Sequence, residues 1–375
     1  MGGAFAPKKF QFSNVCKHCN NVLGTFVDAS YGKSWVVSNN LATMAHDVYY
    51  SLECTPIPLV CLGPVNIPGI QTEEDAIVEW WTGPSGASVI WIRPDDERTY
   101  WYTGGNPGFS RKQPSVAYFI PNSPDETRFR MALASFLAHF KGKNARKVMF
   151  AHFEGMPEDF VYQGFNPQTE SDKHNYEAIH KALESGSVKV SGSWNMWFDH
   201  RFMAKMVLAM GYSFFGNEFI DSPQAIEARK TLWPRDGETQ GLRGTSILGK
   251  EADPNLMKFI GYPSAITIII IRSREDGYSM TVTVNQRIPF FVELAPASLT
   301  SPFIDTEDGY ALLLFPNLKK AIEMTKMELM LHQMGYQKHP ELEAIEKIKQ
   351  DAIHFHKGLA PHTPNLKLGP DLDDE

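Results

Sequence analysis

The sequence contains few cysteines and no long run of apolar residues. Four cysteines in 375 residues are too few to build a disulfide scaffold. The longest apolar run, Ala265–Ile271, has the length of a strand and is too short to cross a membrane. The N-terminus also lacks the apolar segment of a secretory signal. We therefore expect a reduced, cytoplasmic protein that has no membrane partner.

Positive charge is not in excess either. Lysine and arginine together number 36, against 43 aspartate and glutamate residues, which gives a formal net charge of −7. A protein that coats nucleic acid is usually basic, because neutralisation of phosphates supplies much of its affinity. The charge therefore argues against tight non-specific binding, although it leaves room for a local basic patch.

The chain lacks an internal repeat, a glycine-rich phosphate loop, a nucleophile elbow and a regular alternation of strand and helix. Apolar periodicity predicts helices over 125–141, 170–185, 199–215 and 223–232, a helix from Asn40, and a long C-terminal helix broken near 335–340. Asp125 is expected to cap the first of these helices, and Asp221 or Ser222 the fourth. Strands are predicted at 80–81, 88–92, 99–103, 116–120 and 147–153, with an antiparallel group at 265–272, 278–284, 289–294 and 310–315. The expected fold class is α+β.

The segment Asn14–Asp28 carries the clearest chemical pattern. Cys16 and Cys19 are separated by two residues, a spacing that lets one turn of the chain bring both sulfurs to a single Zn²⁺ ion. A redox pair and two unrelated buried thiols are the alternatives for this spacing. The residues that follow can form a helix whose apolar face comprises Val22, Phe26 and Val27. This context favours a metal site over a redox pair or two unrelated thiols.

The phrase from Cys19 to Asp28, Cys-Asn-Asn-Val-Leu-Gly-Thr-Phe-Val-Asp, and the Asn-Val-Cys before it resemble the closing half of the HNH endonuclease family in its zinc-containing form. That family has a His-x-x-Pro-x-x-x-Gly-Gly segment, a spacer, an Asn-x-Cys-x-x-Cys-Asn segment and a helix. Gly2 and Gly3 are similar to its glycine pair. The resemblance implies a remnant of a ββα-metal HNH module, followed by a larger mixed body with an antiparallel sheet and several helices.

The resemblance also implies a role for each matched position. Cys16 and Cys19 would supply half of a structural Zn²⁺ site. Asn20 would stand where the family places a ligand of the catalytic ion, which is Mg²⁺ or another divalent cation. Asn14 would orient the general-base histidine, which activates water while the ion stabilises the scissile phosphate.

The chain departs from the family ahead of these residues. The general-base histidine and a first Cys-x-x-Cys pair would stand before Gly2, but the sequence begins at Met1. Met1 is either internal to a longer reading frame, which the intact glycine pair favours, or the true start of a degenerate module. In both cases we expect this polypeptide to be inactive or impaired as a nuclease.

Other side chains offer weaker candidates. Cys54 and Cys61 are alternative partners for a four-thiolate site, although their flanks are typical of extended core, and His18 is expected to face solvent. Two of the predicted helices carry basic residues that would form a phosphate-contacting strip, namely Arg201, Lys205, Arg229 and Lys230. The alternative is that this helix pair packs its aliphatic face and leaves the charged residues solvated.

The sequence therefore predicts an HNH-type metal-dependent endonuclease that hydrolyses phosphodiesters of nucleic acid, DNA rather than RNA. The first alternative is a non-catalytic zinc-containing module that binds nucleic acid or protein. The second is an enzyme with an active site elsewhere in the body, for which no motif is found. The expected divisions are a partial HNH module at 1–40, a β-rich region at 41–165, a helical pair with an antiparallel sheet and C-terminal helix at 166–358, and a flexible acidic tail at 359–375.

Overall fold

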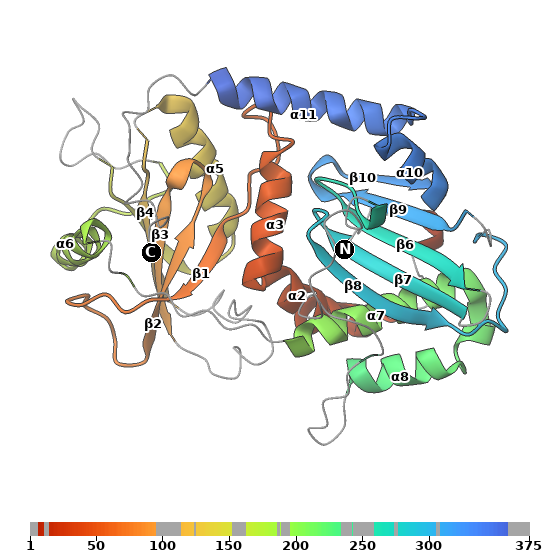
Figure 1. Cartoon of the computed structure of the whole chain (residues 1–375). Helices are drawn as coiled ribbons and strands as arrows, with labels where there is room; N and C mark the ends of the chain where they lie inside the picture. The colour runs from red at the N-terminus through yellow and green to blue at the C-terminus, as the bar shows by residue number, and fades with distance from the viewer. Residues whose placement is uncertain are drawn as a thin grey trace, which may run out of the picture.

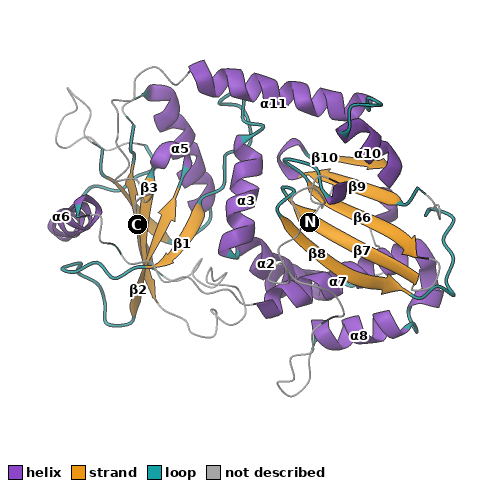
Figure 2. Cartoon of the chain, viewed as in Figure 1, coloured by secondary structure: helices purple, strands orange, loops and turns teal. Residues whose placement is uncertain are grey.

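The computed structural model describes residues 7–10, 15–94, 114–123, 125–151, 163–185, 188, 196–233, 242, 259–273, 277–304 and 308–358. Two five-stranded sheets dominate these residues, and helix α3 (Trp35–His46) lies between them (Figure 1). Figure 2 shows that helices accompany both sheets, which confirms the expected α+β class. Among the described helices, none combines the length and the apolar character needed to cross a membrane.

The first sheet has the strand order β1-β2-β3-β4-β5. Its strands are β1 (Val60–Pro64), β2 (Ala76–Thr82), β3 (Ser88–Pro94), β4 (Ser115–Ile120) and β5 (Ala145–Met149). Neighbouring strands are antiparallel except β4 and β5, which are parallel and are joined by the crossover helix α5 (Glu126–Phe140). A short 3-10 turn, η4 (Pro84–Gly86), connects β2 to β3. The strand expected at 99–103 lies outside the described residues.

Alternation of side chains gives the first sheet two apolar faces. Trp91 belongs to the cluster that packs on Phe136 of α5. Its neighbour Ile90 belongs to the cluster on the opposite face, which contains Ile179 of α6 (Glu170–Glu184). Each face is therefore covered by a helix, and the sheet is the centre of a three-layer lobe.

Local sequence sets the starts of these helices. Asp125 caps α5, as expected, and accepts a hydrogen bond from the backbone N–H of Arg128 at 2.8 Å. Thr169 and Asp172 form a reciprocal capping box at the start of α6. Ser222, the second of the two expected candidates, caps helix α8 (Pro223–Leu232). The predicted helix starts are confirmed at all three places.

The second sheet is antiparallel throughout and has the order β10-β9-β6-β7-β8. Its strands are β6 (Ile266–Ser273), β7 (Gly277–Val284), β8 (Ile288–Ala295), β9 (Tyr310–Phe315) and β10 (Lys320–Met324). The first four confirm the antiparallel group expected from the sequence. The apolar pattern does not predict β10, which pairs with β9 after the 3-10 turn η7 (Pro316–Leu318).

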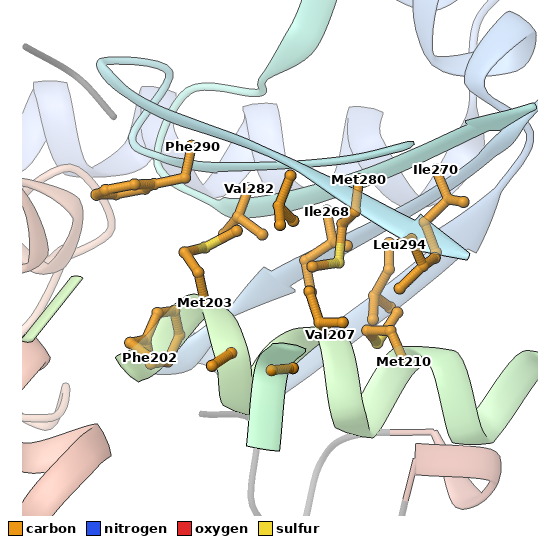
Figure 3. Close-up of a cluster of buried hydrophobic side chains, with 14 of the residues drawn as sticks. Phe202, Met203, Val207, Met210, Ile268, Ile270, Met280, Val282, Phe290 and Leu294 are labelled. Atoms are coloured by element: carbon orange, nitrogen blue, oxygen red, sulfur yellow. The ribbon is translucent and has the colours of Figure 1, made fainter. Parts of the chain in front are cut away.

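Helices cover both faces of the second sheet. They are α7 (Met196–Phe215), α8 (Pro223–Leu232), α10 (Lys326–Gln333) and α11 (Pro340–Gly358), with the 3-10 turn η6 (Gly216–Phe219) between the first two. Figure 3 shows Met203 and Val207 of α7 facing Ile268 and Met280 of the sheet, all in one buried cluster. On the other face, Leu329 of α10 is buried in a cluster with strand residues of β6 and β9. Burial of these apolar faces is the main stabilising contribution to this lobe.

Short helices form the N-terminal part. They are η2 (Lys8–Phe10), α1 (Lys17–Leu23), the π-helix η3 (Gly24–Asp28) and α2 (Ala29–Lys33), followed by α3, which begins before the expected Asn40. Tyr31 of α2 stacks on Phe202 of α7 with ring centroids 3.9 Å apart. Every regular element described up to residue 46 is helical. The ββα-metal module therefore stays a prediction.

A small apolar cluster connects the lobes. It contains Ala45 and Tyr49 at the end of α3, Met131 of α5, and the partly buried Phe355 of α11. Figure 1 shows α11 running along one side of the molecule from the second lobe toward the first. The C-terminal end of α3 therefore contacts both lobes, since Met44 belongs to the cluster of the second lobe and Ala45 to the junction cluster, to which α11 also contributes.

Candidate metal centre

The start of α1 holds the two candidate zinc thiolates. Cys16 is the N-cap residue, with extended backbone angles, and its Sγ accepts a hydrogen bond from the backbone N–H of Cys19 at 3.0 Å. A helix leaves its first N–H groups without backbone partners, so an acceptor at this position is stabilised. Residues three apart lie on the same side of a helical turn. The predicted spacing therefore places both sulfurs at one end of α1.

The two thiols have unequal acidities. The hydrogen bond from the Cys19 side chain, aided by the Cys19 backbone N–H, lowers the pKa of Cys16 below its ordinary value of 9.0. The same side-chain bond raises the pKa of Cys19, because donating to Cys16 requires the proton. Cys16 is therefore the first thiolate of the pair, and a cation that binds both sulfurs must displace the proton of Cys19.

The pair is open to solvent. Every residue from 15 to 21 is exposed, and α1 buries none of its side chains. By contrast, Tyr31 one helix later is fully buried. Structural cysteines are usually buried, so an exposed dithiol is more consistent with ligation or redox chemistry than with packing.

The other predicted metal residues are less defined. Asn14 lies outside the described residues. Asn20 is exposed on α1, next to Cys19, and its backbone N–H donates to the carbonyl of Cys16 at 2.9 Å. Among the described residues, no group of three or more histidine, cysteine, aspartate or glutamate side chains is placed to hold a metal ion. The described part of the site thus consists of two thiols and a neighbouring amide.

An ion pair fixes this segment to the body. The carboxylate of Asp28, at the end of the π-helix, accepts a hydrogen bond from Nζ of Lys205 on α7 at 2.5 Å. A π-turn adds a residue to the helical turn and so changes the direction of the side chains that follow it. Sequence reasoning did not find this pair, because 177 positions separate its members and no local pattern links them.

The four predicted phosphate contacts do not form one exposed strip, which corrects that expectation. Arg201 is only 2% exposed; its Nε donates to the carbonyl of Leu232, and its guanidinium lies over the rings of Trp197 and Trp233 at 4.6 and 5.0 Å. The guanidinium thus makes cation–π contacts with two aromatic rings and a hydrogen bond to the C-terminal end of α8.

The other three predicted phosphate contacts differ in whether their side chains are free to reach a phosphate. Lys205 is paired with Asp28. Arg229 and Lys230 are exposed on α8, and Arg229 also donates to the carbonyl of Ile220 at 2.7 Å. Only these two residues are placed as the phosphate-contact hypothesis requires.

The remaining cysteines belong to other environments. Cys61 packs at the edge of the α5-side cluster of the first sheet, where burial raises the pKa of its thiol. Cys54 packs against the cluster at the end of α3 and lies 3.9 Å from the carbonyl of Val48. Neither thiol is grouped with Cys16 and Cys19 in a ligand set among the described residues.

Comparison with known proteins adds no family. A scan against protein-family models, a search of curated proteins and a search of solved structures each found no match. Any functional argument therefore starts from the geometry of α1 and the resemblance of its sequence.

Proposed function

We propose that Cys16 and Cys19 hold half of a structural Zn²⁺ site in an HNH-type module, and that the chain acts on nucleic acid, DNA rather than RNA. The observation that carries the proposal is the geometry of the pair. Cys16 caps α1 with its Sγ 3.0 Å from the backbone nitrogen of Cys19, and both side chains are exposed. Soft thiolate donors at this spacing suit Zn²⁺.

The class of reaction is metal-dependent hydrolysis of a phosphodiester. A divalent ion such as Mg²⁺, when bound, would supply Lewis acidity at the scissile phosphate. The amide oxygen of Asn20 is the candidate ligand that this chain contributes. Activation of water needs a general base, and among the described residues no group of three or more histidine, cysteine, aspartate or glutamate side chains surrounds Asn20. We therefore expect this chain to hydrolyse nucleic acid poorly or not at all.

One observation favours a second candidate, a non-catalytic zinc-containing module that binds nucleic acid or protein. Within the described residues, no third titratable ligand accompanies the thiols. A module of this kind needs its zinc only to hold a binding surface. Lys17 and His18, both exposed beside the thiols, would then contribute to that surface.

Metal analysis tests the site. The full chain is purified under reducing conditions and its zinc is measured by elemental analysis, alongside Cys16→Ser, Cys19→Ser and the control Cys54→Ser. We expect zinc to bind the unsubstituted chain and Cys54→Ser, and to be lost from the other two variants. A chain that binds no zinc, or that keeps it after both α1 substitutions, would contradict the proposal.

Nucleic-acid assays then separate the two functions. Duplex DNA and duplex RNA of the same sequence are titrated with zinc-loaded protein, and plasmid nicking is followed with Mg²⁺ or Mn²⁺. We expect the protein to bind DNA only when it is loaded with zinc. We also expect it to nick plasmid no faster than Cys16→Ser does. Robust nicking would show that the missing-base argument is wrong. Failure to bind either DNA or RNA would favour a protein partner.

A further inference from the structure

The outer side of α8 presents two cations between an aliphatic side chain and an indole ring. Ile226 is followed by Arg229 and Lys230, and these by Trp233, at spacings of three and four residues. Such spacings place side chains on one side of a helix. All four side chains are exposed, whereas the opposite side of the helix is buried in the core of the second lobe. Figure 1 shows α8 at the outer edge of that lobe.

The ring of Trp233 is anchored from the inside. The guanidinium of Arg201 lies 5.0 Å from its centroid and 4.6 Å from that of Trp197, so one cation contacts both indoles. Arg201 is itself buried and donates to the carbonyl of Leu232. Trp233 nevertheless stays 44% exposed. Its ring is therefore held in place before any ligand arrives, which lowers the entropy cost of stacking a flat group on it.

We propose that this side of α8 binds single-stranded DNA, with a base stacked on Trp233 and backbone phosphates on Arg229 and Lys230. The inference rests on the nucleic-acid partner of the proposed function and names its form. Indole rings stack on bases of any sequence, and arginine and lysine attract the phosphates. The bases of a duplex are already stacked on their neighbours, so an unpaired strand fits this surface better.

Charge favours a polyanionic partner at this place. The chain as a whole carries a net charge of −7, which repels nucleic acid. The outer side of α8 departs from that average, because Arg229 and Lys230 are exposed while the one acid of the helix, Glu227, is half-buried. An acidic peptide would also be attracted by the two cations, but it would not offer Trp233 a base to stack on. The indole and the cations together therefore favour the nucleic acid.

Fluorescence anisotropy tests the surface. A labelled single-stranded DNA of about 16 nucleotides, and the duplex formed with its complement, are titrated with the zinc-loaded full chain at several salt concentrations. We expect the single strand to bind more tightly than the duplex. Trp233→Leu should weaken its binding at least about fivefold, through lost stacking. Lys230→Gln should reduce the slope of log affinity against log salt by about 0.7, through one lost phosphate contact.

Two substitutions elsewhere are the matched controls. Trp35→Leu removes another exposed tryptophan, and Lys347→Gln removes an exposed lysine of α11; both should leave the affinity unchanged. Because Trp233 also contacts Arg201, the melting temperature of each variant is measured. Trp233→Phe keeps an aromatic ring and should retain more of the binding than Trp233→Leu.

The zinc content of each variant separates this inference from the proposed function. Loss of DNA binding in Trp233→Leu, with zinc and folding retained, supports the α8 surface. DNA binding that survives Trp233→Leu and Lys230→Gln, or that is equal for single strand and duplex, would overturn this surface and leave the proposed function standing. Failure of the zinc-loaded chain to bind either DNA would overturn both. Displacement of the DNA by polyglutamate at equal charge would assign the surface to an acidic protein instead.

Discussion

At the scale of single residues, Asp172 holds several parts of the first lobe together. Its carboxylate accepts hydrogen bonds from the guanidinium of Arg146, from Tyr118 Oη at 3.0 Å, and from the hydroxyl and backbone N–H of Thr169. The side chain is 1% exposed, so these bonds replace all of its contact with water. It links α6 to strands β4 and β5.

Replacing Asp172 by asparagine is therefore expected to be costly. The amide keeps the shape but removes the charge, and it leaves Arg146 without its carboxylate. Loss of one member of a buried pair costs about 3–5 kcal/mol, and the partial exposure of Arg146 suggests the lower end, about 3 kcal/mol. Urea unfolding measures the change. Glu170→Gln, an exposed position on the same helix, is the control and should change the free energy of unfolding by less than about 0.5 kcal/mol.

The same residue predicts a pH dependence. Burial alone would raise the pKa of Asp172, but the hydrogen bonds from Arg146, Thr169 and Tyr118 together hold it below its ordinary value of 3.8. Because the folded pKa is depressed, the stabilisation is complete above pH 3.8 and is lost as the pH falls through the folded pKa. The gap in unfolding free energy between the unsubstituted chain and Asp172→Asn should narrow below pH 3.8. A gap that stays constant down to acid unfolding would disprove this assignment.

Gly211 of α7 has no room for a side chain. A Cβ atom there would lie 2.2 Å from the ring of Phe219, which is 1% exposed and cannot move aside freely. We expect Gly211→Ala to destabilise the second lobe by about 1–3 kcal/mol through overpacking. Gly32→Ala in α2, where a Cβ would meet nothing within 4 Å, is the matched control and should be neutral or stabilising by up to about 1 kcal/mol. Thermal unfolding of both variants gives the comparison; equal melting temperatures would refute the steric argument.

At the scale of elements, the sequence predicted helices and strands where one local pattern dominates. The stripe Phe129–Phe140 with its Asp125 cap defines α5, and the run Ile266–Ile271 defines β6. It did not predict β10, because Lys320–Met324 is short and four of its five residues, Lys, Ala, Glu and Met, favour helix over strand. Only pairing with β9 makes this segment a strand.

In the candidate site, too, the sequence predicted local arrangements but not contacts between distant segments. The Cys16–Cys19 arrangement could be predicted because the two residues lie in one helical turn. The environments of Arg201 and Lys205 could not, because periodicity indicates which face of a helix a residue occupies but not what covers that face. Trp233 and Asp28 cover them, and both come from distant parts of the chain.

The Asp28–Lys205 pair predicts how the N-terminal helices are held. Asp28→Asn removes the charge that keeps the π-helix on α7, and since both side chains are about a quarter exposed, we expect a loss of about 1–2 kcal/mol. Hydrogen exchange should accelerate in residues 17–33 and stay unchanged in the first sheet. Lys230→Met, on the exposed side of α8, is the control. Unchanged protection of 17–33 in Asp28→Asn would mean that the apolar packing of Val27 and Tyr31 holds these helices without the ion pair.

At the scale of the whole molecule, the two lobes meet at the ends of α3 and α11. The rings of His46 and His356 stack with centroids 3.9 Å apart and an interplanar angle of 9°, and Nε2 of His356 lies 3.2 Å from the carbonyl of His46. Tyr49 packs beside the stack, and the charge of Asp47 acts on His356 in favour of its protonated form. Because the stack contains two titratable rings, the junction should respond to pH.

Burial, followed by the charge of His46, lowers the pKa of His356 from its ordinary value of 6.5. The unfolded chain then binds the proton more readily, so the stabilisation is complete above pH 6.5 and falls as the pH drops toward the folded pKa. We expect residues 350–358 to lose protection from hydrogen exchange, corrected for intrinsic rates, between pH 7.5 and 5.5. His356→Phe keeps an aromatic ring in the stack but cannot be charged, so its protection should depend less on pH. If both proteins respond equally, another group governs the junction, and the stack of His46 and His356 serves only as packing between the lobes.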